Sequence, residues 1–235
     1  MSTVAQTFDQ AALNYDQQLQ QGLSLSGEAA DYFVQGRIAQ LQKLLHARAC
    51  KPQRVLDFGC GIGNAAEELA DAFSVAQYVG YDCSAESIEV ARGRSDREDC
   101  RWTDNAAELA ERDFDLVHTS GVFHHIEPHE RDQHLQCIRS WLKPGGYFAF
   151  FENNPWNPGT QWVMSRIPFD RDAQCLSLLQ ARSRLQRAGF EIVTQQTLFF
   201  LPSSLAMLRP IEPWLQWTPC GAQYLILCRR PHEDQ

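Results

Sequence analysis

The sequence has few of the features that mark nucleic-acid-binding, secreted or membrane-spanning proteins. It contains no run of Lys or Arg, and its formal net charge of -8 argues against a large phosphate-binding surface. Its most apolar C-terminal stretch, Leu198 to Trp217, is interrupted by prolines and charged residues, so it is a poor membrane-span candidate. Met1 to Gln10 lack a basic segment followed by an apolar core, so we expect no secretory signal. These absences favour a cytoplasmic protein without a nucleic-acid partner.

The cysteines form no recognisable pair or metal motif. Eight are present, and no two have the C-x-x-C spacing. They are scattered through expected strands and helices, which suits reduced and partly buried thiols. We therefore expect neither a disulfide framework nor a cysteine-based zinc site.

The apolar pattern alternates between short β-rich runs and helical periods, which is typical of a parallel α/β sheet. The 235 residues suit one domain. A turn is expected at Lys143–Gly146 and a helix from about Asp172 to Ala188. Strands are expected at residues 54–58, 78–82, 100–103, 114–119, 147–151, 191–198 and 222–228.

The strongest motif is the run Val55-Leu56-Asp57-Phe58-Gly59-Cys60-Gly61-Ile62-Gly63, between an expected strand and an expected helix. Glycines there let the backbone approach a ligand and adopt positive φ. A dinucleotide fingerprint requires glycine at position 64, which is Asn64, so that reading fails. S-adenosylmethionine carries an α-amino group in place of a pyrophosphate, and Asp57 is placed to hold it. The alternative is a glycine-rich turn without a ligand.

Asp82 supplies a second signal at the end of the next expected strand. It follows Gly63 by nineteen residues, and a carboxylate at such a strand end can accept both ribose hydroxyls. An isolated Asp at a strand end is more often a solvated turn residue. Its spacing from the glycine loop favours the binding role.

These motifs, with Asp104, Phe114-Asp115-Leu116-Val117 and Leu142-Lys143-Pro144-Gly145-Gly146, resemble the successive motifs of class I S-adenosylmethionine-dependent methyltransferases. The opening Phe8-Asp9-x-x-Ala12-x-x-Tyr15-Asp16 is similar to the start of the ubiquinone and menaquinone biosynthesis methyltransferases. The resemblance covers roughly residues 8–152.

The resemblance implies a Rossmann-like, doubly wound, seven-stranded sheet, mostly parallel with an antiparallel last strand and helices on both faces. It implies that Asp104 or Asn105 meets the adenine amino group and that Ser120 lies near the cofactor. The predicted S-adenosylmethionine-binding residues are Asp57, Gly59, Cys60, Gly61, Asp82, Cys83, Asp104, Asn105 and Ser120. The expected division is a helical cap at 1–50, a cofactor-binding core at 51–152 and a substrate side at 153–235, with a lid near 202–221.

The pair His124-His125 follows the fourth expected strand, where this family often places residues beside the methyl donor. His125 has a suitable pKa to accept a proton from the substrate, and the alternative is a structural hydrogen bond. A histidine pair can bind metal, but no third ligand is apparent, so we expect no metal. Glu152 reads equally well as a pocket carboxylate or an ordinary strand-end residue.

Asn153-Asn154-Pro155-Trp156 superficially resembles the box of DNA-adenine and glutamine methyltransferases. That box follows the fourth strand, whereas this one follows the fifth, so we reject the analogy. The loop is instead expected to line the substrate pocket or to turn the chain. Aromatic residues here and at Trp214 and Trp217 indicate an apolar or aromatic acceptor, with an interface as the alternative role of those two tryptophans.

The sequence therefore predicts transfer of a methyl group from S-adenosylmethionine to an O, N or C nucleophile of a small molecule by in-line displacement. The cofactor carries the difficult chemistry, and the protein supplies orientation. An RNA methyltransferase and a non-catalytic cofactor-binding protein are the alternatives.

Overall fold

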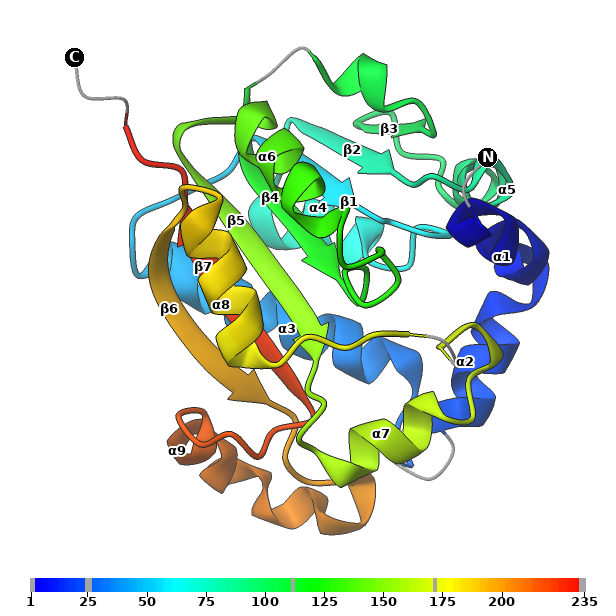
Figure 1. The fold of residues 1–235 in the computed structure, drawn as a ribbon, viewed down its shortest axis with the longest axis vertical. Coiled ribbons are helices and arrows are strands. Elements are labelled where there is room, and N and C mark those ends of the chain that lie inside the picture. The colour runs from blue at the N-terminus through cyan, green and yellow to red at the C-terminus, as the bar shows by residue number, and fades with distance from the viewer. Residues whose placement is uncertain (1–2, 24–26, 111–112, 171–172, 233–235) are drawn as a thin grey trace.

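A seven-stranded sheet lies at the centre of the molecule (Figure 1). The computed structural model describes residues 3–23, 27–110, 113–170 and 173–232. The strand order is β3-β2-β1-β4-β5-β7-β6. β7 is antiparallel to both of its neighbours, and every other neighbouring pair is parallel, as predicted. The strands are β1 Arg54–Phe58, β2 Gln77–Tyr81, β3 Cys100–Thr103, β4 Phe114–Ser120, β5 Leu142–Asn153, β6 Glu191–Leu198 and β7 Gln223–Arg229.

Helices cover both faces of the sheet. In Figure 1, α6 and α8 lie in front of it, and α3 and α4 lie behind. Among the described residues, no helix combines the length and the apolar character needed to cross a membrane. The α-helices are α1 Thr3–Ala11, α2 Tyr15–Leu23, α3 Ala30–His46, α4 Ala66–Phe73, α5 Ala85–Arg94, α6 Arg131–Trp141, α7 Pro158–Met164, α8 Leu178–Arg187 and α9 Glu212–Leu215. The 3-10 helices are η1 Ala12–Asn14, η2 Ala106–Ala110, η3 Pro168–Asp170 and η4 Ser203–Ile211.

Period-two alternation explains why the middles of the central strands are apolar on both faces of the sheet. Along β7, Tyr224 and Ile226 enter the core beneath α6 and α8, whereas Leu225 and Leu227 enter the core beneath α3 and α4. Because helices cover both faces of the sheet, the side chains on both sides of the strand must be apolar. Polar groups of the central strands are therefore concentrated where the strands end.

Two boundaries, the start of β5 and the start of α8, differ from the expectations by more than two residues. The predicted turn Lys143–Gly146 lies within β5, where it forms a bulge: Phe114 pairs with Leu142, but Leu116 pairs with Tyr147. Gly145 there adopts a φ of 82° and donates its N–H to the carbonyl of Arg230. The helix expected from Asp172, a residue outside the described part of the chain, begins only at Leu178. Ser177 caps it in a capping box with Gln180, which fixes the later start.

The strand order places the glycine loop at the point where the chain changes direction across the sheet. β1 lies between β2 and β4, and the connections after β1 and β4 lead to opposite sides. Ligands of open α/β sheets bind in the crevice at the carboxyl ends of strands at such a switch point. The fold therefore opens its crevice beside Gly59–Gly63 and the loop after β4.

We predict that Leu56→Ala lowers the free energy of unfolding by about 2–5 kcal/mol, because it leaves a cavity in the centre of the sheet. Leu56 is fully buried on β1. Leu179→Ala on α8 is the control, since its side chain is 59% exposed, and it should change stability by about 0.5 kcal/mol or less. Urea unfolding of both variants checks this; equal effects would contradict the assignment of the core.

Candidate active site

A cavity of about 750 Å³ opens at the carboxyl ends of β1, β2, β4 and β5. Its volume lies in the upper part of the range of about 300–1,000 Å³ that small-molecule pockets occupy. Of the predicted site residues, the structure brings eight to its wall: Asp57, Gly59, Cys60, Gly61, Asp82, Cys83, Ser120 and His125.

The glycine loop and Asp82 form one hydrogen-bonded unit. Asp82 accepts the N–H of Gly61 at 2.9 Å through one carboxylate oxygen and the N–H of Ser84 at 2.9 Å through the other. Burial raises the pKa of Asp82, and these two N–H groups oppose the shift. Gly61 has a φ of 53°, and a Cβ built on it would meet no protein atom within 4 Å. The loop thus leaves open space above Gly61, at the pocket wall.

Opposite charges lie at the same end of the pocket. Asp57 is only 3% exposed; its carboxylate accepts the hydroxyl of Tyr78 at 2.9 Å and contacts Nδ1 of His118 at 2.7 Å. Arg37 from α3 also lines the pocket and donates to Gln223 at 3.1 Å. Burial lowers the pKa of Arg37 to about 10, and the negative charge of Asp57 opposes the shift, so Arg37 remains protonated at neutral pH.

The N-terminal helices dock onto the sheet through the residues of the opening motif. The ring of Phe8 meets His125 edge-on, with centroids 4.9 Å apart, and the hydroxyl of Ser84 donates to Asp9 at 2.7 Å. Tyr15 stacks on Phe169 at 4.9 Å. These contacts hold α1 and α2 over the pocket, which both helices help to line.

Four predicted residues lie outside the pocket wall. Asp104 and Asn105 are exposed after β3, where Asn105 accepts the N–H of Ala107 and stabilises a turn. Their contact with adenine stays a prediction. Trp214 and Trp217 are 81% and 71% exposed and do not line the cavity, so their predicted contribution to an apolar acceptor site is wrong. In the segment between β6 and β7, residues 199–202 line the cavity instead.

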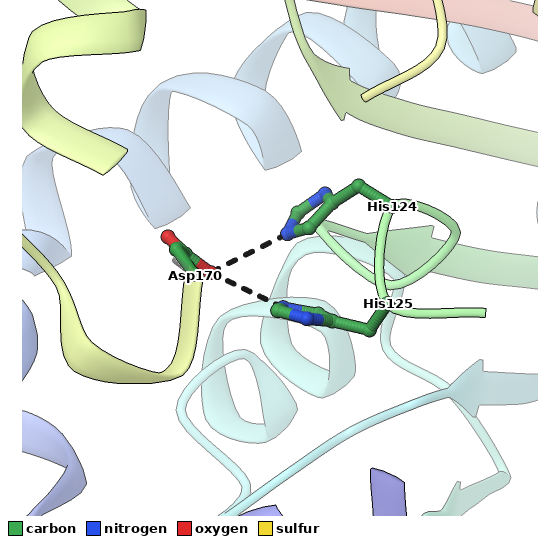
Figure 2. A group of neighbouring side chains, drawn as sticks. All are labelled: His124, His125 and Asp170. Atoms are coloured by element: carbon green, nitrogen blue, oxygen red, sulfur yellow. Dashed lines mark ion pairs between the residues drawn. The ribbon is translucent and has the colours of Figure 1, made fainter. Parts of the chain in front are cut away.

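Two histidines and Asp170 meet on the wall beside the carboxyl end of β4 (Figure 2), and a second carboxylate, Glu152, contacts His124. His124 is buried, with Nδ1 2.6 Å from Glu152 and Nε2 3.6 Å from Asp170. His125 Nε2 lies 3.2 Å from the same Asp170 oxygen. Glu152 also accepts the N–H of Phe123 at 2.7 Å, so the carboxylate is fixed in place.

The two histidines have opposite pKa shifts. Burial acts to lower the pKa of His124, but the charges and hydrogen bonds of Glu152 and Asp170 outweigh it and raise the pKa to about 10. Burial and the neighbouring His124 lower the pKa of His125, although Asp170 opposes the shift. His125 is therefore neutral at neutral pH, as its predicted role as a general base requires. That role stays a prediction.

Asp170 lies beside both histidines as a third potential metal ligand, which the sequence did not reveal. His124, His125 and Asp170 each offer one ligand atom, and these atoms all lie within 4.8 Å of one another, a spacing that one metal ion can bridge. Asp170 is 45 positions beyond His125 and belongs to a short 3-10 helix after a loop, so nothing in the sequence connects the two. The structure thus supplies a candidate third ligand that was not apparent in the sequence, and the expectation of no metal stays a prediction.

Arg37 was also missed, although a signal for it exists. The buried positions of α3 are Val34, Ile38, Leu41 and Leu45. Arg37 follows Val34 by three residues and precedes Leu41 by four, so it lies on the inward face of the helix. A charged residue on an inward face indicates a buried partner or ligand.

The family model described as "Methyltransferase domain" matches residues 30–195. A fatty-acid O-methyltransferase from Mycolicibacterium smegmatis is 29% identical over 206 residues, covering 83% of this chain and 68% of that protein. The membership of the ubiquinone and menaquinone subgroup stays a prediction.

Solved structures share the fold at lower sequence identity. A possible histamine N-methyltransferase from Thermotoga maritima has a TM-score of 0.65 and 18% identity, covering 96% of this chain and 99% of that one. The N-methyltransferase NodS from Bradyrhizobium japonicum, in complex with S-adenosyl-L-homocysteine, has a TM-score of 0.58 and 15% identity, covering 83% and 86%.

We predict that the stabilisation from the His124 proton is lost at high pH. Because the folded pKa of about 10 exceeds the ordinary value of 6.5, the contribution is complete below pH 6.5 and disappears as the pH rises through 10. The free energy of unfolding of the wild type should exceed that of His124→Gln by a margin that shrinks between pH 7 and pH 10. Urea unfolding with a chelator present measures this; a margin independent of pH would contradict it.

Proposed function

The chain belongs to the methyltransferase domain family and is an S-adenosylmethionine-dependent methyltransferase, and on that premise we propose that its acceptor is a small molecule with an apolar body. The observation that carries the proposal is a single cavity with a charged end that suits the cofactor and an apolar, aromatic wall beside it. The acceptor presents an O, N or C nucleophile to the methyl group.

The charged end fits the cofactor's amino-acid part. Asp57 and Arg37 carry opposite charges there, and they match a free α-amino group and an α-carboxylate. Asp82 has both oxygens held by backbone N–H groups, which orient the carboxylate to accept the ribose hydroxyls. The open space above Gly61 leaves room for the cofactor to cross the loop. S-adenosylmethionine supplies an activated methyl group, so these residues need only bind and orient it.

The other walls support an apolar acceptor. Phe8, Phe33, Ile167, Phe169 and Phe199 line them, together with Leu19 and Leu23 of α2. Burial of an apolar body there is favourable by about 25 cal/mol per Å² of surface removed from water. The similarity to a fatty-acid O-methyltransferase agrees with such an acceptor. An RNA acceptor is the second candidate, and the net charge of -8 disfavours it.

We predict that Arg37→Met and Asp82→Ala weaken different parts of cofactor binding. Each should raise the dissociation constant of S-adenosylhomocysteine about 10- to 100-fold, because a charged hydrogen-bond partner is lost. Methylthioadenosine lacks the amino-acid part, so Arg37→Met should leave its binding unchanged, whereas Asp82→Ala should weaken it. Calorimetry measures both ligands, and Arg182→Met on the exposed face of α8 is the control. Equal losses of both ligands in Arg37→Met would contradict the assignment.

We predict that labelled methyl groups from S-adenosylmethionine pass to small apolar acceptors and not to RNA. Phe33→Ala should raise the acceptor's KM at least several-fold while cofactor affinity is unchanged, since Phe33 lines the wall. Trp217→Ala should leave KM unchanged, because that side chain lies outside the pocket. The assay screens amphiphilic acids, amines and phenols alongside total RNA. Transfer to RNA alone would overturn the proposal.

A further inference from the structure

We propose that His124, His125 and Asp170 bind one divalent transition-metal ion, whose open coordination position faces the pocket. The three side chains converge from two separate segments, the loop after β4 and the 3-10 helix η3 (Figure 2). Two imidazoles and one carboxylate are the ligand set of open, three-residue zinc and iron sites. Such a set disfavours Mg²⁺ and Ca²⁺, which take oxygen ligands.

The spacing between ligand atoms is that of a single coordination sphere. Metal–ligand bonds of about 2.0–2.2 Å in a tetrahedral site place neighbouring ligand atoms about 3.3–3.6 Å apart. His125 Nε2 lies 3.2 Å and His124 Nε2 lies 3.6 Å from the same Asp170 oxygen. These two distances match such a sphere, and all three ligand atoms lie within 4.8 Å of one another.

Glu152 occupies the position of an outer-sphere partner. Its carboxylate lies 2.6 Å from Nδ1 of His124, which leaves Nε2 of that ring facing Asp170. A carboxylate on the far nitrogen orients a metal-binding imidazole and increases its basicity. The N–H of Phe123, at 2.7 Å, fixes Glu152 in turn. Glu152, near the carboxyl end of β5, therefore holds the ring of His124 in the orientation that metal binding requires.

The surroundings favour a cation. Glu152 and Asp170 carry two negative charges at sites that are almost fully buried. Phe8 and Phe169 pack near His125, with ring centroids 4.9 Å and 6.4 Å from its ring, and they limit water on that side. A divalent ion neutralises both carboxylates in this low-dielectric environment. In its absence, N–H groups of the two histidines fill the contacts with Asp170, and the ion displaces those protons to solvent.

The three ligand residues all line the cavity, so the remaining coordination position is accessible from it. Resting on the proposed function, we infer that this position takes an oxygen of the acceptor, such as a carboxylate or hydroxyl, and holds it as the anion. The metal-free alternative is that His125 alone accepts the acceptor's proton. The two roles exclude each other. Without metal, Nε2 of His125 donates its proton to Asp170 and Nδ1 is the free base, whereas a metal ion on Nε2 leaves the ring's one proton on Nδ1, so no lone pair remains to accept another.

The test uses the full chain stripped with a chelator and titrated with Co²⁺, followed by visible absorption. We expect one Co²⁺ per chain with the bands of a four- or five-coordinate ion, and displacement by one equivalent of Zn²⁺. Asp170→Ala and His125→Ala should each weaken binding at least 100-fold, and Glu152→Gln should weaken it about 10- to 100-fold while the stoichiometry is retained. The control is His129→Ala, which removes an exposed histidine four residues after His125. It should bind Co²⁺ as the wild type does.

Each variant is also titrated with S-adenosylhomocysteine, which shows that its fold is intact and tests the cofactor site separately. Octanoate added to the Co²⁺ form, with S-adenosylhomocysteine present, should shift the cobalt bands as its carboxylate enters the open position. Absence of Co²⁺ binding below millimolar concentrations, or equal binding in wild type and Asp170→Ala, would overturn the metal site. Unchanged bands with octanoate would overturn the acceptor's contact with the ion. Normal Co²⁺ binding without cofactor binding would instead contradict the proposed function alone.

Discussion

The structure depends on burial of the sheet on both faces. With α3 and α4 on one face and α6 and α8 on the other, the middles of the central strands are closed to water. Buried polar groups that lack partners are costly, so such strands are apolar in their middle and carry their chemistry at their ends. The parallel strands end at one edge, and there Asp57, Asp82 and Ser120 come together around one cavity, while Glu152 contacts His124 of its wall.

The same burial makes the charges at this edge selective. Asp57 and Arg37 lie in a region of low dielectric, where an unpaired ligand charge is costly and a complementary one is strongly favoured. On the proposed function, a zwitterionic amino-acid group would satisfy both residues, which a neutral or singly charged ligand would not. We therefore expect the pocket to distinguish ligands by charge pattern as well as by shape.

The proposed acceptor side uses a different principle. Its walls are apolar side chains from α2, α3 and η3, so they favour an acceptor by the area that it buries and leave its exact shape loosely specified. The cluster of His124, His125 and Asp170 provides directional contacts on this wall near the carboxyl end of β4. On the proposed function, this cluster would orient the reacting atom.

Local patterns in the sequence were sufficient to locate the strands, whereas the antiparallel last strand was implied by the family resemblance. Each strand's apolar run and each glycine turn reflect the backbone and neighbours within a few residues, so strands such as Arg54–Phe58 and Cys100–Thr103 were predicted exactly. The glycine loop and Asp82 were also predicted, since a fixed strand–loop–helix unit carries them. The bulge at Lys143–Gly146 was not, because a turn and a bulge use the same residues and only pairing with β4 distinguishes them.

The sequence by itself determined the alternating α/β pattern, the place of the glycine loop and the histidine pair after β4, because each depends on short-range order along the chain. Only the tertiary structure decided which distant side chains complete the site. Asp170 reaches His125 across 45 positions, and Arg37 reaches the end of β1 from α3. It also removed Trp214 and Trp217 from the pocket. The physical reason is that these contacts are set by how the helices and loops pack over the strand ends, which no local pattern encodes.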